Sequence, residues 1–270
     1  MICFDLDGTL LTSDKSLSER TKEALLHAVE MGIHIVPATG RPASGLPEQL
    51  MKIPGIRYVI TSNGARVLDC KEDALLFSDN LPVEKARKVL DIFEEYDTLR
   101  EIYYDGIGYA DQDRLENVHI YMKDPAVASY ICKSRRPVKS TREKFEEENR
   151  GLDKIQAVFA SMEERQDAWD RIRQSVDNVT MASALLCNIE VNDGCVNKGA
   201  ALLKLAQILG IKREEVMAFG DGDNDTRMLE AAGIGVAMGN AVEEVKLVAD
   251  IIAPSNDQDG VAKIIEQYIL

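Results

Sequence analysis

Short apolar segments alternate with helical segments near both ends of the chain, and this alternation limits the possible folds more than any other feature. Ser16, Ser18 and Glu19 form a capping-box pattern that opens a predicted helix, which ends at Gly32. Helices placed between strands in this way predict a parallel, doubly wound α/β sheet. The strands predicted in the first part of the chain cover residues 2–6, 33–38 and 58–61.

The pattern changes after about residue 80 and returns after residue 188. A predicted helix over residues 82–96 is followed by a hairpin that turns at Asp105-Gly106. A polar stretch over residues 133–150 is predicted to be a loop or a solvated helix. The sequence therefore predicts a discontinuous core, residues 1–80 and 188–270, with an inserted α+β domain, residues 81–187.

The charge balance argues against two classes of partner. Lys and Arg number 32 and Asp and Glu number 46, so the net charge is −14. Binding to nucleic acid or to an anionic membrane needs clustered positive charge, so neither partner is expected. An anionic small molecule is still possible, because a local cation or metal can override the net field.

Cysteine usage and the N-terminal residues predict a cytoplasmic protein. The five cysteines are odd in number and form no C-x-x-C pair, so neither a disulfide framework nor a zinc site is expected. Acidic residues stand at positions 5 and 7, where a signal peptide would have basic ones. No apolar run approaches the ~18 residues of a membrane span.

Two aspartates directly follow the first predicted strand. Asp5 and Asp7 are two residues apart, so in extended backbone both side chains point the same way. Open α/β sheets bind ligands at the carboxyl ends of their strands, and carboxylates brought together favour a cation between them. An Asp-x-Asp pair alone is more often a solvated turn, but the buried strand before it and Gly8 after it favour a site.

A second acidic cluster, residues 220–225, follows the predicted strand over residues 216–219. Gathering so many carboxylates without a metal is costly. Alternating aspartates also occur in EF-hand calcium loops, but Thr226 stands where that loop needs glycine and Ala232 where it needs glutamate. The cluster therefore predicts a metal site of another kind.

Residues suited to phosphate lie near two further element ends. Thr39-Gly40-Arg41 follows the second strand, and Lys198 opens a helix. Hydroxyl and helix-terminal N–H groups can hold phosphoryl oxygens, and a lysine at a helix start can neutralise their charge. Each residue alone more often caps a helix or lies in solvent, so the combination carries the prediction.

Together these residues resemble the four motifs of the haloacid dehalogenase (HAD) superfamily of phosphatases, in the same order. The motifs are Asp5-x-Asp7-x-Thr9, the strand end at Thr39, Lys198, and the run Gly220-Asp221…Asn224-Asp225. Motifs one and two are 39 − 5 = 34 residues apart, and 198 − 39 = 159 residues separate motifs two and three. That spacing resembles the Cof-type branch, whose large α/β cap lies between motifs two and three. The segments 61–65, with Asn63, and 237–241, with Asn240, look like further signatures of the branch.

The resemblance implies a Rossmann-like core with an inserted α+β cap, and a phosphatase that acts on a small phosphorylated metabolite. Asp5 would be the nucleophile that forms an aspartyl-phosphate, and Asp7 the general acid and base. The residues expected to bind the phosphoryl group are Thr39, Gly40 and Lys198, with Arg41 and Asn63 as further candidates.

The implied cofactor is Mg²⁺. Its ligands would be Asp5, the carbonyl of Asp7 and Asp221, while Asn224 and Asp225 would orient waters or Lys198 around them. Asp223 is expected to face solvent, because the motif does not require it.

Two alternatives share part of this chemistry. A receiver-type phosphoaccepting module also uses an acidic cluster, a threonine and a lysine, but it is about half this length and carries its phosphoacceptor in mid-chain. A phosphomutase would need a cap between motifs one and two, which the spacing does not allow. The sequence is compatible with a monomer or a weak homo-oligomer.

Overall fold

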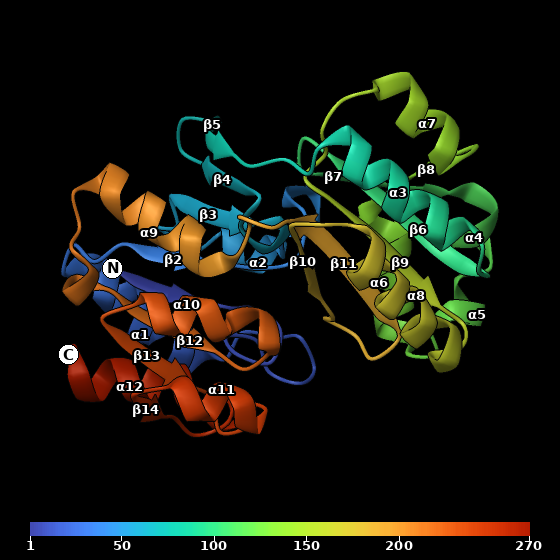
Figure 1. Ribbon diagram of the computed structural model, residues 1–270. Coiled ribbons are helices and arrows are strands. Elements are labelled where there is room, and N and C mark those ends of the chain that lie inside the picture. Colours follow the sequence, from blue (N-terminus) through green and yellow to red (C-terminus); the bar gives the residue numbers. More distant parts are fainter. The chain divides into compact units, whose positions relative to one another are not determined.

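The chain divides into two units in the computed structural model, which describes residues 1–270 (Figure 1). The first unit comprises Met1–Gly40, Leu46–Ser78 and Asn197–Leu270. The second comprises Arg41–Gly45 and Asp79–Val196.

A parallel five-stranded sheet forms the centre of the first unit, in the order β14-β13-β12-β1-β2. Phe4 of β1, which lies between β12 and β2, is in register with Phe219 on one side and Pro37 on the other. The strands are β1 (Ile2–Phe4), β2 (Ile35–Pro37), β12 (Met217–Gly220), β13 (Ile234–Ala237) and β14 (Ile251–Ile252).

Helices cover both faces of this sheet, because successive side chains of each strand point to opposite sides. Ile2 and Phe4 pack with α1 (Glu19–Glu30) and α12 (Gly260–Tyr268). Cys3, between them, packs on the other face, where α9 (Lys198–Leu209), α10 (Thr226–Ala231) and α11 (Glu243–Val248) lie. The predicted doubly wound α/β core is therefore confirmed.

The sequence prediction missed an antiparallel extension beside this sheet. β3 (Tyr58–Thr61) touches the parallel sheet through a bridge between Ala38 and Ile60. It then pairs antiparallel with β4 (Arg66–Asp69), which pairs with β5 (Ala74–Ser78). The region after Pro42 forms no long helix. It contains the 3₁₀ turn η1 (Ala43–Gly45) and the short helix α2 (Glu48–Met51).

The second unit is built on a six-stranded sheet in the order β10-β11-β9-β6-β7-β8, antiparallel except where β7 meets β8. The predicted hairpin turn at Asp105-Gly106 joins β6 to β7, and both residues have positive φ, 53° and 76°. The strands are β6 (Thr98–Tyr104), β7 (Ile107–Asp111), β8 (Arg135–Val138), β9 (Lys154–Phe159), β10 (Val179–Ala182) and β11 (Asn188–Asp193).

Apolar side chains of α3 (Val83–Glu94) and α8 (Met162–Ser175) pack against one face of this sheet. A smaller apolar cluster on Leu99, Ala110 and Val158 packs with residues of three short helices. Those helices are α4 (Gln112–Glu116), α5 (Val118–Tyr121) and α6 (Pro125–Ser134). The inserted α+β fold is thus confirmed.

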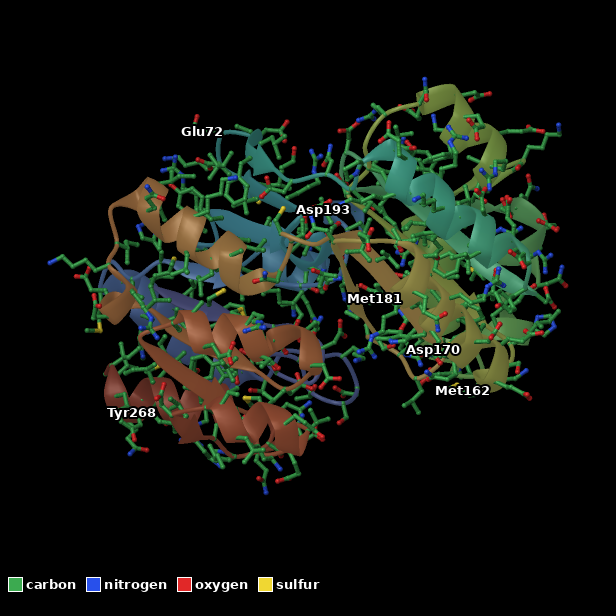
Figure 2. The ribbon with its side chains drawn as sticks, in the orientation of Figure 1. Glu72, Met162, Asp170, Met181, Asp193 and Tyr268 are labelled. Carbon is green, nitrogen blue, oxygen red and sulfur yellow. The ribbon has the colours of Figure 1, made fainter.

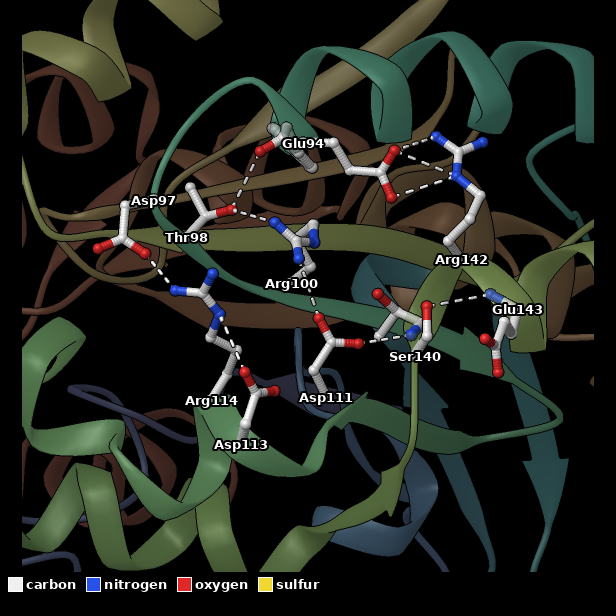
Figure 3. Close-up of polar contacts among 12 residues, drawn as sticks. Glu94, Asp97, Thr98, Arg100, Asp111, Asp113, Arg114, Ser140, Arg142 and Glu143 are labelled. Atoms are coloured by element: carbon white, nitrogen blue, oxygen red, sulfur yellow. Dashed lines mark hydrogen bonds and ion pairs between the residues drawn. The ribbon is translucent and has the colours of Figure 1, made fainter.

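The charged stretch over residues 133–150 was predicted to be a loop or a solvated helix; it contains a helix, with a strand before it, and several of its charges are paired (Figure 3). It forms β8 and α7 (Thr141–Glu148). Arg142 of α7 donates to Glu94 of α3 at 2.6 Å, and Arg100 of β6 donates to Asp111 of β7 at 3.0 Å.

The division near residue 196 differs from the predicted boundary after residue 187. β11 pairs with β9 and β10, so it lies in the sheet of the second unit. Its last residue is Asp193, which is labelled in Figure 2. Asp193 accepts a hydrogen bond from Lys85 of α3 at 2.7 Å. An apolar strand before a helix start looks the same in sequence whichever sheet it joins.

None of the helices combines the length and apolar character that crossing a lipid bilayer requires.

Candidate active site

Two carboxylates extend from neighbouring strands of the parallel sheet. Asp5 directly follows β1 and Asp221 directly follows β12. The backbone N–H of Asp5 donates to the carbonyl of Phe219 at 3.0 Å, which continues the pairing of the two strands to their ends. The carboxyl ends of parallel strands lie on one edge, so both side chains enter the same site.

Lys198 supplies the positive charge of this site. It is the first residue of α9, and the side chain of Asn197 caps the helix by accepting from the backbone N–H of Ala200 at 2.8 Å. The Lys198 side chain is fully buried, and its Nζ donates to Oδ1 of Asp5 and Oδ1 of Asp225, each at 2.6 Å. One ammonium therefore joins residues that are far apart in the sequence.

Asp225 is fixed on both of its oxygens. Oδ1 accepts from Lys198, and Oδ2 accepts from the backbone N–H groups of Asp221 and Gly222, each at 3.0 Å. Carboxyl oxygens from Asp5, Asp221 and Asp225 lie within 4.8 Å of one another. Because both oxygens of Asp225 already have donors, Asp5 and Asp221 are the members better placed to bind a cation directly.

The electrostatics of this cluster are unbalanced. Burial, opposed by Lys198 and reinforced by the neighbouring carboxylates, raises the pKa of Asp5 to about 8. Burial and the charge of Asp225 raise the pKa of Asp221 to about 6. Burial opposes the charge of Lys198, but Asp225 and Asp5 hold its pKa above the usual value.

These residues fit a divalent cation. Three ionised carboxylates and one ammonium would carry −3 + 1 = −2 charges, so Lys198 alone would not balance them. Oxygen ligands are those that Mg²⁺ prefers. A divalent cation among the oxygens would stabilise the ionised carboxylates.

The turn after Asp5 is shaped around Asp221. Gly8 has φ +89°, and a Cβ there would stand 2.3 Å from Oδ2 of Asp221, so only glycine fits. Thr9, which carried no assigned role in the sequence, donates through Oγ1 to Oδ1 of Asp221 at 2.6 Å. Asp7 is 36% exposed, and its Oδ1 lies 2.9 Å from Nζ of Lys15.

Thr39 and Gly40 of the second motif lie near Asn63, beyond the carboxyl end of β2. Thr39 is buried beyond the end of β2, with Gly40 after it. Asn63 has φ +61°, donates through its backbone N–H to the Thr39 carbonyl at 3.0 Å, and accepts from Nδ2 of Asn224 at 3.2 Å. These contacts connect the second and fourth motifs. Asp223, between the metal candidates, is exposed as expected.

Arg41 is the one candidate that belongs to the second unit. Its guanidinium lies over the ring of Tyr130, 4.6 Å from the centroid, and its Nη1 donates to the carbonyl of Gly45 at 3.3 Å. Both of these contacts lie within the second unit.

Asn240 supports the first motif from a third strand. It follows β13, and its Nδ2 donates to the Gly8 carbonyl at 2.8 Å while its Oδ1 accepts from the N–H of Asn256 at 3.0 Å. Nδ2 of Asn256 in turn donates to the carbonyl of Leu11 at 2.9 Å. Asn240 was predicted only as a member of the signature segment 237–241, without a role. Its place after the strand next to β12 was the signal that could have found it.

The chain is similar to known proteins over nearly its whole length. Residues 2–265 match the family model described as haloacid dehalogenase-like hydrolase. Phosphatase YwpJ of Bacillus subtilis is 31% identical over 100% of this chain and 99% of its own. Pyridoxal phosphate phosphatase YbhA of Escherichia coli is 29% identical over 100% of this chain and 98% of its own.

Solved structures agree with this match. A haloacid dehalogenase-like hydrolase from B. subtilis superposes with a TM-score of 0.85 at 32% identity, covering 100% of this chain and 99% of its own. A sugar phosphatase of HAD subclass IIB gives a TM-score of 0.85 at 26% identity, covering 99% of this chain and 98% of its own.

Proposed function

This chain is an enzyme of the haloacid dehalogenase-like hydrolase family, and from that membership and the site we infer that it removes phosphate from a small phosphorylated metabolite through an aspartyl-phosphate on Asp5. The observation that carries the proposal is the buried ammonium of Lys198, 2.6 Å from both Asp5 and Asp225 at the strand ends. A carboxylate held beside a fixed cation is suited to receive a phosphoryl group, whose transfer depends on positioning and charge.

In the first step, an oxygen of Asp5 attacks phosphorus. The new bond from Asp5 to phosphorus forms as the bond to the leaving oxygen breaks, and Asp7 gives its proton to that oxygen. Lys198, Thr39 and the N–H of Gly40 hold the oxygens of the transferred group. The alcohol then leaves.

In the second step, water attacks phosphorus of the aspartyl-phosphate. Asp7, now ionised, takes a proton from the water, and the bond between Asp5 and phosphorus breaks. Inorganic phosphate leaves, and Asp5 regains its carboxylate. One side chain thus serves as acid and then as base.

Asp5, the carbonyl of Asp7 and Asp221 would hold Mg²⁺, with Asn224 and Asp225 orienting the groups around it. Bound there, the ion would neutralise charge on the phosphoryl oxygens and lower the pKa of Asp5. Thr9 fixes one oxygen of Asp221, and Asp225 fixes Lys198.

The test is phosphate release from a panel of small phosphorylated metabolites at a fixed excess of Mg²⁺. Sugar phosphates and pyridoxal phosphate belong in it, because relatives named for both are similar to this chain. We expect release from at least one compound and its loss on chelation. Transfer of label between hydroxyls without release would indicate a phosphomutase, and a stable phosphoprotein without turnover a receiver.

Asp221→Ala should weaken Mg²⁺ binding more than Asp223→Ala does. Asp221 lies in the carboxylate cluster, whereas Asp223 is exposed in the same loop and serves as the matched control. We expect the half-saturating Mg²⁺ concentration to rise about 10-fold or more for Asp221→Ala and to stay near wild type for Asp223→Ala. Equal shifts for the two variants would show that the ligands are wrongly chosen.

Two further expectations stay predictions. The first is a cytoplasmic location, a reducing compartment in which free thiols such as these five are usual. A monomer or weak homo-oligomer is expected, and neither nucleic acid nor membrane is expected as a partner.

A further inference from the structure

Asp7 is held by a cation that the four motifs do not include. Nζ of Lys15 lies 2.9 Å from Oδ1 of Asp7, eight residues back along the chain. The carboxylates whose oxygens gather within 4.8 Å are those of Asp5, Asp221 and Asp225, and Asp7 is not among them. Its carboxylate therefore has a separate partner at the edge of the cluster.

Lys15 sits in a turn that is ordered by many contacts. Thr12 and Ser16 close the turn, since the N–H of Thr12 donates to the Ser16 carbonyl at 3.0 Å and the N–H of Lys15 to the Thr12 carbonyl at 2.9 Å. Asp14 accepts from the Ser16 hydroxyl at 2.7 Å. The backbone of Lys15 has φ +63°, which is uncommon for a residue with a side chain.

Two contacts from distant segments fix the turn in the first unit. The hydroxyl and the N–H of Ser13 each donate to Asp257 at 2.7 Å. Nε2 of Gln49 donates to the carbonyl of Lys15 at 2.9 Å. The backbone from which the lysine extends is thus anchored on both sides.

We propose that Lys15 is a positioning residue for Asp7. This inference rests on the proposed function. A general acid must lie within hydrogen-bond reach of the leaving oxygen, and small displacements cost rate. Three nearby carboxylates repel Asp7, and a cation drawn into the cluster would attract it. Lys15 holds one oxygen of Asp7 at the edge of the site, so that the carboxyl stays available to the leaving group.

An alternative explanation is an ordinary surface ion pair, since Lys15 is 46% and Asp7 36% exposed. Such pairs add little to stability. The two explanations differ in what the loss of Lys15 changes. A surface pair changes nothing in the reaction, whereas a positioning residue changes the step in which Asp7 gives up its proton.

The test compares Lys15→Met and Lys15→Arg on two substrates. Glycerol phosphate has an alkoxide leaving group that needs a proton, and p-nitrophenyl phosphate has one that does not. For Lys15→Met we expect kcat/KM to fall about 10-fold on glycerol phosphate and less than about 3-fold on p-nitrophenyl phosphate. Lys15→Arg should restore most of the loss, and Tm should move by about 2 °C or less.

Two controls separate the possible failures. Lys22→Met removes an exposed lysine that pairs with Glu19, and it should match wild type on both substrates. In an Asp7→Asn background, Lys15→Met should add no further loss. If Asp7→Asn keeps full activity on glycerol phosphate, the proposed function is wrong. If Asp7→Asn is impaired but Lys15→Met acts equally on both substrates, or not at all, only the role of Lys15 is overturned.

Discussion

Replacing Asp5 with asparagine is expected to abolish phosphate release and leave the fold intact. The amide keeps the shape of the side chain but cannot form the bond to phosphorus, so kcat/KM should fall roughly 10⁴-fold or more. Burial raises the pKa of Asp5, so the ionised carboxylate at neutral pH is unfavourable in the folded state without metal. Removing that charge offsets the loss of its pairing with Lys198, which keeps Asp225 as a partner, so Tm without metal should stay close to that of wild type.

Phosphate release and a thermal melt on the same preparation check this prediction. Asp223→Asn is the matched control, because it makes the same chemical change at an exposed position of the fourth motif. Ordinary turnover by a well-folded Asp5→Asn protein would show that another residue carries the reaction.

Lys198→Met is expected to reduce both activity and stability. It removes the ammonium that Asp5 and Asp225 share and leaves two buried carboxylates without their counter-charge. Removing one partner of a buried ion pair costs about 3–5 kcal/mol, and loss of a charge that stabilises the transferred group costs about 10²–10³-fold in rate. Added Mg²⁺ should recover part of the stability and little of the rate.

Denaturant unfolding with and without Mg²⁺, together with kcat/KM, measures these effects. Lys204→Met is the control, since Lys204 lies on the same helix and its ammonium lies over the ring of Phe77. A Lys198→Met protein as stable and active as Lys204→Met would contradict the account of the site.

The grouping of the candidate site residues at one edge of the core was predictable because the signals for it are local. Asp5 and Asp221 each follow an apolar strand directly, and parallel strands place such residues on one edge. The first residue of α9 was also predicted at Lys198, and in the structure the side chain of Asn197 caps the helix there. Local signals of this kind do not depend on which elements later become neighbours.

Three features were not predicted: the unit that β11 joins, the cap of α1 and the pairing of Asp7 with Lys15. Each depends on contacts between elements that are apart in the sequence. Nothing in the sequence of β11 shows whether it joins the sheet of the first unit or the second, and its partners β9 and β10 decide. The cap of α1 is Ser18, whose side chain accepts from Thr21, while Ser16 is engaged in the turn with Thr12. The pairing of Asp7 with Lys15 likewise requires that turn to be folded back.

The central claim, that phosphate passes through a covalent bond to Asp5, is tested most directly by trapping the intermediate. The protein is quenched during turnover of its best substrate and treated with borohydride, which reduces an acyl phosphate to an alcohol. Peptide mass spectrometry should then find homoserine at position 5, in a fraction that rises with substrate and is absent from Asp5→Asn. Homoserine at another aspartate, or an unmodified position 5 in protein quenched while phosphate is being released at full rate, would contradict the account.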